Sequence, residues 1–61
     1  MFKIGEFSRL TCLSIRMLRY YDEVGLLTPL RTDRYSGYRF YSADQILAAN
    51  RIRLLRDFGF G

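Results

Sequence analysis

The two helical segments at the start of the chain lie so close together in sequence that they must meet at a tight turn. Apolar side chains recur at three-residue spacing over residues 4–10, which predicts a short amphipathic helix. Ser14 is a good N-cap for a second helix over residues 15–24, and Gly25 provides its left-handed stop. A short helix, a break and a newly capped helix predict a helix-turn-helix over residues 4–24.

The helix over residues 15–24 has two chemically different faces when its residues are placed about 100° apart. The inner face, which we expect to bury against the first helix, carries Ile15, Met17, Leu18 and Tyr21. The outer face carries Arg16, Arg19, Tyr20 and Glu23. Arginine and tyrosine side chains on one exposed arc suit the major groove of DNA.

Residues 30–41 have the composition of a small β-ribbon. Turn-forming residues lie in the middle, namely Asp33, Ser36 and Gly37. Residues 38–41 read as a strand, in which we expect Phe40 to point toward the core and Arg39 to point away from it. A two-stranded ribbon directly after a helix-turn-helix is the position of a wing.

A third helix is predicted over residues 42–58. Ser42 and Gln45 match a capping box, and Tyr41 and Ile46 can form a hydrophobic staple. Two apolar rows follow, one of Ile46, Ala49, Ile52 and Leu55 and the other of Leu47, Leu54 and Phe58. Two rows exceed what a small domain needs, so we expect one of them to face a part of a longer protein.

A chain of 61 residues has room for one small domain. We expect residues 1–61 to form a single mainly α domain, a winged helix-turn-helix with three helices and a two-stranded hairpin, as a fragment of a longer regulator. One cysteine and no histidine argue against an internal disulfide or a zinc site, and we expect no cofactor. The chain has no signal peptide and no run of about 18 apolar residues, so we expect a cytoplasmic protein that does not bind membranes.

The positive charge of the chain is carried almost entirely by arginine. The formal net charge is +4, and of the ten lysine and arginine residues only Lys3 is lysine. Arginine forms bidentate contacts with phosphates and guanine edges. The charge therefore favours nucleic acid as the partner, although charge alone is a weak indication.

Several stretches resemble the N-terminal domain of the MerR family. They are IGEFS at residues 4–8, SIRMLRYYD at 14–22, GLL at 25–27, GYRFYS at 37–42 and GF at 59–60. Each alone is weakly specific, but their order and spacing together cover essentially the whole chain. The resemblance extends to members that respond to organic or multidrug ligands.

The resemblance implies a regulator that binds promoter DNA as a homodimer, held by a long helix C-terminal to this domain. It further implies a small-molecule effector bound by a separate C-terminal domain, which makes the protein bend and untwist the promoter. RNA polymerase then engages both promoter elements. None of these properties follows from the composition or periodicity of the chain.

Two residues depart from the family pattern. Cys12 stands in the turn between the helices, where the family usually has glycine; a positive φ there would cost about 1 kcal/mol. We otherwise expect Cys12 to be a small buried residue rather than a redox or metal site. Met17 replaces a smaller residue, and if it reaches a base edge it would contact a thymine methyl.

Three residues of the second helix are the main candidates for DNA contact. We expect Arg16 to contact a base edge or a phosphate in the major groove. Arg19 would bind phosphate, or would brace the fold by pairing with Asp22 or Glu23. Tyr20 points outward and can offer its hydroxyl to a phosphate.

The remaining candidates lie on the core side of the helix and in the wing. Tyr21 is as well suited to packing as to contact with DNA. In the wing, Arg39 is the strongest candidate for a phosphate clamp, and Tyr38 is next, with packing within the wing as its alternative. Arg34, near the tip, would approach the DNA backbone or the minor groove, or would be a solvated loop residue. Contacts of this kind position a protein on DNA, and only those with base edges specify sequence.

Three other functions are compatible with parts of the pattern. An excisionase-like architectural protein would use a similar winged domain, and a protein-interaction module would use the scaffold without nucleic acid. An enzyme is disfavoured, because the chain has no histidine, no paired carboxylates in a plausible cleft and no glycine-rich phosphate loop.

Overall fold

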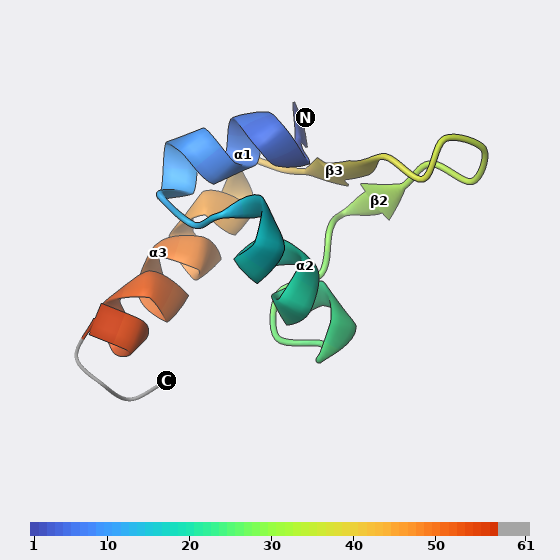
Figure 1. Cartoon of the computed structure of the whole chain (residues 1–61). Helices are drawn as coiled ribbons and strands as arrows, with labels where there is room; N and C mark the ends of the chain where they lie inside the picture. Colours follow the sequence, from blue (N-terminus) through green and yellow to red (C-terminus); the bar gives the residue numbers. More distant parts are fainter. Residues whose placement is uncertain (58–61) are drawn as a thin grey trace.

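The computed structural model describes residues 1–57, which form three helices and a small antiparallel sheet (Figure 1). The elements in chain order are β1 (Phe2–Lys3), α1 (Ile4–Thr11), α2 (Ile15–Glu23), β2 (Arg31–Thr32), β3 (Arg39–Tyr41) and α3 (Asp44–Asp57). The helices pack together, and the β2–β3 hairpin projects away from them (Figure 1). The predicted fold class, a mainly α winged helix-turn-helix, is confirmed. None of the helices within residues 1–57 is long and apolar enough to cross a membrane.

The turn between α1 and α2 is fixed by local hydrogen bonds. Ser14 caps α2, its Oγ accepting a hydrogen bond from the Met17 amide at 3.1 Å. The buried hydroxyl of Thr11 donates to the Phe7 carbonyl at 2.8 Å. Cys12 ends α1 with φ of 61°, so the turn does require the left-handed conformation that glycine adopts most easily. The expectation of a buried thiol is wrong, because Cys12 is exposed.

Helix α2 ends at Glu23, and Val24 and Gly25 follow as its C-terminal cap. Gly25 has φ of 76°, as its role as a left-handed stop predicted. Its amide donates to the Asp22 carbonyl at 3.1 Å, and the Leu26 amide donates to the Tyr21 carbonyl at 2.8 Å. These bonds satisfy carbonyls that the helix end would leave without partners.

The sheet has three strands in the order β1-β3-β2, whereas the sequence predicted two. The hairpin pairs Arg31 with Phe40, and the N-terminal strand pairs Phe2 with Tyr41 on the other edge of β3. The additional strand forms because Phe2–Lys3 is extended and its backbone groups can pair only along the free edge of β3. The start of the chain is thereby joined to the base of the wing.

The core lies where the three helices meet β3. Its buried hydrophobic residues are Phe7, Leu13, Leu18, Tyr21, Leu27, Tyr41 and Ala49. The rings of Phe7 and Tyr41 stack with centroids 4.3 Å apart and planes 10° from parallel. Tyr41 and Arg39, two residues apart on β3, therefore lie on its inner face, so the expectation that Phe40 faces the core and Arg39 faces away is wrong. Phe40 is half-buried, with the Arg31 guanidinium 5.4 Å from its ring centroid. Ile15, predicted on the buried face of α2, is exposed at 41%.

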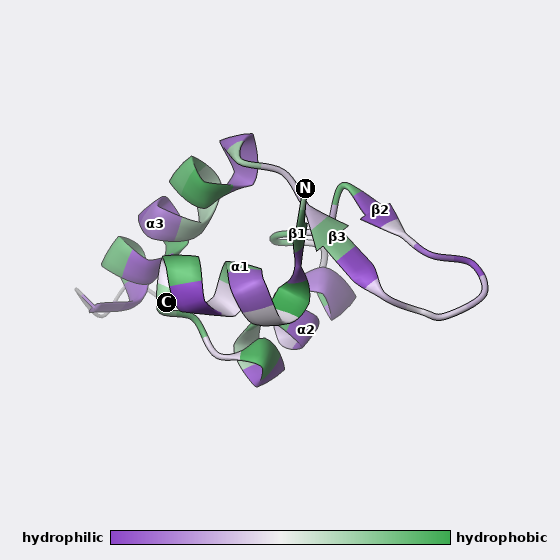
Figure 2. Ribbon diagram, turned by 90° about the horizontal axis from the view of Figure 1, so that it is seen from above, coloured by the Kyte–Doolittle hydropathy of each residue, from purple (hydrophilic) through white to green (hydrophobic). Residues whose placement is uncertain are grey.

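Helix α3 begins at Asp44, two residues later than predicted. The Gln45 side chain accepts a hydrogen bond from the Ser42 amide at 3.0 Å, which is one half of the predicted capping box. Hydrophobic and hydrophilic residues alternate along the helix (Figure 2). In the first apolar row Ala49 is buried and Leu55 is exposed, with Ile46 and Ile52 packed against the core.

The second apolar row of α3 is exposed. Leu47 is 68% exposed and Leu54 is 49% exposed. Phe58, the third member of that row and the predicted end of the helix, lies outside the described residues, as does the GF pair at 59–60. The row that the core does not use is therefore Leu47 and Leu54, within the part of the chain that the structure describes.

Candidate nucleic-acid interface

The outer face of α2 presents the cationic and aromatic side chains that the helical periodicity predicted there. Arg16 and Arg19 are exposed, and Tyr20 is 58% exposed. Tyr21 belongs to the core at 8% exposure, and its ring centroid lies 6.1 Å from that of Tyr20. Of the two adjacent tyrosines, Tyr20 is thus the one available to a ligand.

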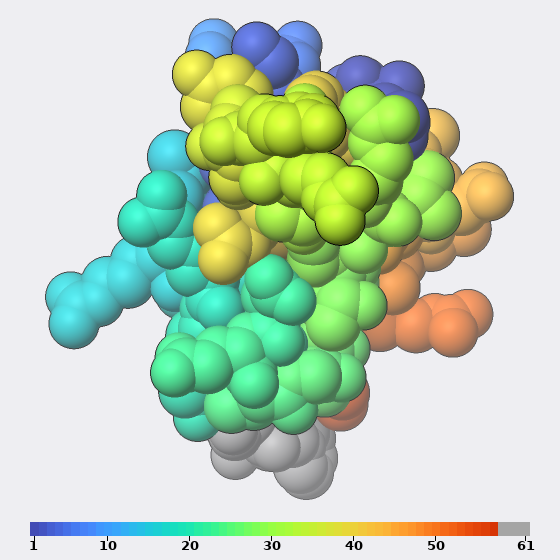
Figure 3. Space-filling model, turned by 90° about the vertical axis from the view of Figure 1, so that its right-hand side faces the viewer, coloured from blue at the N-terminus to red at the C-terminus, as the bar shows by residue number. Residues whose placement is uncertain are grey.

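The wing and α2 reach the same face of the molecule, as the space-filling view in Figure 3 shows. Between them and the N-terminus of α1 lies a hollow of about 610 Å³. Its lining side chains include four cations, Lys3, Arg9, Arg19 and Arg39, and one carboxylate, Glu6. Four positive charges against one negative leave an excess of three positive charges. We call this feature the basic hollow.

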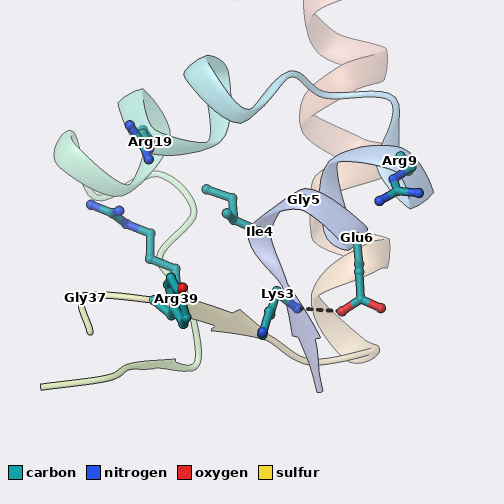
Figure 4. A pocket seen from close by; sticks show the side chains of 9 residues that line it. Lys3, Ile4, Gly5, Glu6, Arg9, Arg19, Gly37 and Arg39 are labelled. Carbon is teal, nitrogen blue, oxygen red and sulfur yellow. Dashed lines mark hydrogen bonds between the residues drawn. The ribbon is translucent and has the colours of Figure 1, made fainter. Parts of the chain in front are cut away.

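Arg39 joins the wing to α2. Its Nε lies 2.9 Å from Oδ2 of Asp22, and the two side chains are 30% and 24% exposed. In Figure 4 the Arg39 side chain extends from β3 toward α2 and Arg19. An Nε contact leaves both terminal nitrogens of the guanidinium, which carry four of its five N–H donors. Arg39 is therefore placed to hold α2 and to present donors at the basic hollow.

Arg19 does not pair with a carboxylate among residues 1–57. The ion pairs within residues 1–57 are Arg39 with Asp22 and Arg56 with Asp57. The alternative in which Arg19 braces the fold through Asp22 or Glu23 is therefore not observed. Arg19 instead lines the basic hollow opposite the wing (Figure 4).

Tyr38 directly precedes β3 at the end of the wing loop, is 57% exposed, and lines the same hollow. The ammonium group of Lys3 lies 5.1 Å from the centroid of its ring, within the range of a cation–π interaction. Lys3 is brought there by the pairing of β1 with β3. Neither Lys3 nor Arg9 was among the predicted contacts; for Lys3, no local pattern predicts that the first strand joins the wing.

The tip of the wing is ordered by Asp33. Its carboxylate accepts hydrogen bonds from the amides of Tyr35 at 2.7 Å and Ser36 at 3.1 Å. These backbone hydrogen bonds hold the pKa of Asp33 below its ordinary value of 3.8. Arg34 and Tyr35 are exposed there, Tyr35 at 93%. Tyr35 was not among the predicted contacts, although its place between Asp33 and Gly37 would have indicated a tip residue.

Met17 is half-buried, and its side chain contacts α3. The residue packs against the core, and its sulfur is 3.0 Å from a terminal nitrogen of Arg56. Flexible methionine side chains fill irregular gaps of this kind. The structure thus places Met17 between the two helices.

Comparison with known proteins identifies similar domains along nearly the whole chain. The model of the MerR HTH family of regulatory proteins matches residues 2–61. The transcriptional regulator BrlR of Pseudomonas aeruginosa is 43% identical over 56 residues, which cover 92% of this chain and 21% of BrlR. The heavy metal-dependent transcription regulator 2 of Rhizobium meliloti is 41% identical over 58 residues, covering 93% of this chain and 38% of the relative.

Solved structures agree with these matches. The EcmrR–DNA complex in EcmrR-RPo superposes with a TM-score of 0.91 at 40% identity, covering 98% of this chain and 22% of that chain. MtaN, the N-terminus of the Bacillus subtilis multidrug transporter activator, gives 0.86 at 28% identity and covers 100% of this chain and 57% of that chain. The relatives carry the names of regulators, and neither the excisionase-like nor the protein-interaction alternative is favoured. The chain spans about a fifth of the length of BrlR.

Proposed function

The chain belongs to the MerR HTH family of regulatory proteins, and from that premise we propose that it is the double-stranded DNA-binding head of a bacterial transcription regulator. Helix α2 enters the major groove, and the wing contacts the backbone of the same duplex. The observation that carries the proposal is the basic hollow, onto which Arg19 of α2 and Arg39 of the wing both open. One duplex can meet both elements there.

The contacts divide by the position of each side chain. Arg16 and Tyr20 project from the outer face of α2, where Arg16 reaches base edges and Tyr20 a phosphate. Arg19, Tyr38 and Arg39 hold phosphate around the basic hollow, and Arg34 approaches the backbone from the wing tip. Tyr21 and Met17 support α2 from the core side rather than read sequence.

The complete protein has more parts than this domain. We propose that a helix C-terminal to it forms a homodimer, that a further domain binds a small-molecule effector, and that the dimer distorts promoter DNA for RNA polymerase in the cytoplasm. The relatives support this proposal because they are several times longer than the segment matched here. The neighbour EcmrR supports it as well, since its structure was solved with DNA in EcmrR-RPo.

The proposal is tested by selecting bound duplexes from a random library and measuring their affinity at several salt concentrations. We expect a sequence preference, and binding that weakens steeply with salt because each neutralised phosphate contributes about −0.9 to the slope of log K against log salt. R16A should weaken selected duplexes more than random ones, because Arg16 is assigned to base edges. No enrichment of any sequence, together with a flat salt dependence, would show that the domain binds something other than DNA.

A further inference from the structure

Strand β1 brings the cationic side chain of Lys3 next to the wing, although β1 belongs neither to the helix-turn-helix nor to the hairpin of the wing. β1 pairs antiparallel with β3, with Lys3 opposite Phe40 in the register. The Lys3 ammonium group then lies over the ring of Tyr38, 5.1 Å from its centroid. The N-terminal strand and the wing therefore meet at one charged group on the rim of the basic hollow.

We propose that Lys3, held over the Tyr38 ring, is a phosphate-binding residue that contacts the backbone of the bound duplex at the rim of the basic hollow, which Arg19 and Arg39 also line. The inference rests on the proposed function, since it names the part of the DNA that occupies the basic hollow. Of the four cations that line that hollow, Lys3, Arg19 and Arg39 come from three separate elements, β1, α2 and β3. Figure 4 shows Lys3, Arg19 and Arg39 on the same side of α1.

The ring of Tyr38 gives Lys3 its position. A lysine side chain is long and flexible, and it loses conformational freedom when it is fixed on a ligand. A cation over an exposed aromatic ring gains enough to hold it near one place before the ligand arrives. Lys3 is thus already placed at the rim in the free protein, and part of the cost of binding phosphate is met in advance.

Glu6 provides a second prediction, because its negative charge should weaken DNA binding where the charge of Lys3 strengthens it. It lines the basic hollow, and its Oε1 accepts a hydrogen bond from the Lys3 backbone amide at 3.2 Å. Its negative charge repels a phosphate in the hollow. A glutamine at this position keeps the accepting oxygen, as in capping boxes that end in glutamine, while it removes the charge. E6Q should therefore tighten DNA binding without loosening the start of α1.

The test compares K3Q, E6Q and the control R51Q in DNA affinity titrations across salt concentrations. Arg51 is exposed on α3 and does not line the hollow, so R51Q removes one positive charge at a distance from it. We expect K3Q to reduce the slope of log K against log salt by about one, and R51Q to leave that slope unchanged. E6Q should raise the affinity at low salt.

A double-substitution cycle tests the role of the ring. Y38L removes the ring, and K3Q should then weaken binding about two- to fivefold less than it does in the parent chain. Equal effects of K3Q and R51Q, or a strictly additive K3Q and Y38L pair, overturn the assignment of Lys3 while the chain still binds DNA. Failure of the parent chain to bind DNA would instead overturn the proposed function, and this inference with it.

Discussion

Cys12 occupies a left-handed backbone conformation that glycine adopts more easily than cysteine. Its φ of 61° lies in the left-handed region, where a side chain with a Cβ is disfavoured. We expect C12G to stabilise the fold by roughly 0.5 kcal/mol, because relief of about 1 kcal/mol is partly offset by the greater freedom of glycine in the unfolded chain. Urea unfolding followed by circular dichroism measures the change. C12A keeps the Cβ and should leave the stability unaltered; a gain equal to that of C12G would locate the effect in the thiol instead.

Tyr41 is fully buried, and its hydroxyl has no hydrogen-bond partner among residues 1–57. Its ring contributes the stacking on Phe7, whereas an unpaired buried hydroxyl is unfavourable. We expect Y41F to leave the stability unchanged or raise it by up to about 1 kcal/mol, measured by thermal unfolding at pH 7. A loss of stability in Y41F would mean that the hydroxyl does have a partner in solution.

The same residue makes the stability depend on alkaline pH. Burial, with the charge of Asp22 second, raises the pKa of Tyr41 above its ordinary value of 10.0. The folded state favours the protonated hydroxyl of Tyr41, and this contribution to the free energy of unfolding is fully present below pH 10.0. It is lost as the pH rises through the pKa of Tyr41 in the folded protein. Y41F lacks the titrating group, so its stability should fall less above that pH than that of the parent chain.

At the scale of elements, the wing and α2 are held in a fixed relation by the ion pair of Arg39 with Asp22. R39K keeps the charge but lacks the Nε donor, and D22N removes the carboxylate charge. We expect each to cost roughly 0.5–1 kcal/mol, since both side chains are partly exposed, and the double variant to cost little more than either one. Unfolding of the four chains gives the coupling. Additive losses would mean that the pair does not link the two elements.

The wing tip should lose order in acid. Asp33 has a lowered pKa because two backbone amides donate to its carboxylate, so its contribution to the turn is present above the ordinary value of 3.8 and is lost as the pH falls through the folded value. Amide chemical shifts of Tyr35 and Ser36 should therefore move together in an NMR titration below pH 3.8. D33A should show the acid-state shifts at neutral pH. Shifts that stay constant down to pH 2 would contradict this account of the turn.

Local chemistry explains which elements the sequence predicted. The Ser14 cap, the Gly25 stop and the Asp33 turn each act within a few residues, so each is visible in the order of residue types. The pairing of β1 with β3 joins residues nearly forty apart and follows no local pattern. That pairing accounts for the third strand, and the stacking of Phe7 on Tyr41 accounts for the buried face of β3. Both errors arose because the segments involved lie far apart in the sequence.

At the scale of the whole molecule, the described residues contain a single α2 helix and a single wing, while the relatives are several times longer. If the complete protein is a dimer, its two linked DNA-binding domains gain about 10²–10⁴ in affinity over a single domain. The 61-residue chain should therefore occupy two half-sites of one duplex independently and weakly.

Analytical ultracentrifugation with duplexes of one and two half-sites measures this occupancy. Fusion of the chain to a short dimerising coiled coil is the matched comparison, because it adds the link without altering the DNA-binding surface. The fusion should bind the two-site duplex tightly and the one-site duplex about as weakly as the chain alone. Cooperative binding by the unfused chain would show that its own surface, such as the exposed Leu47 and Leu54 row of α3, already joins two copies.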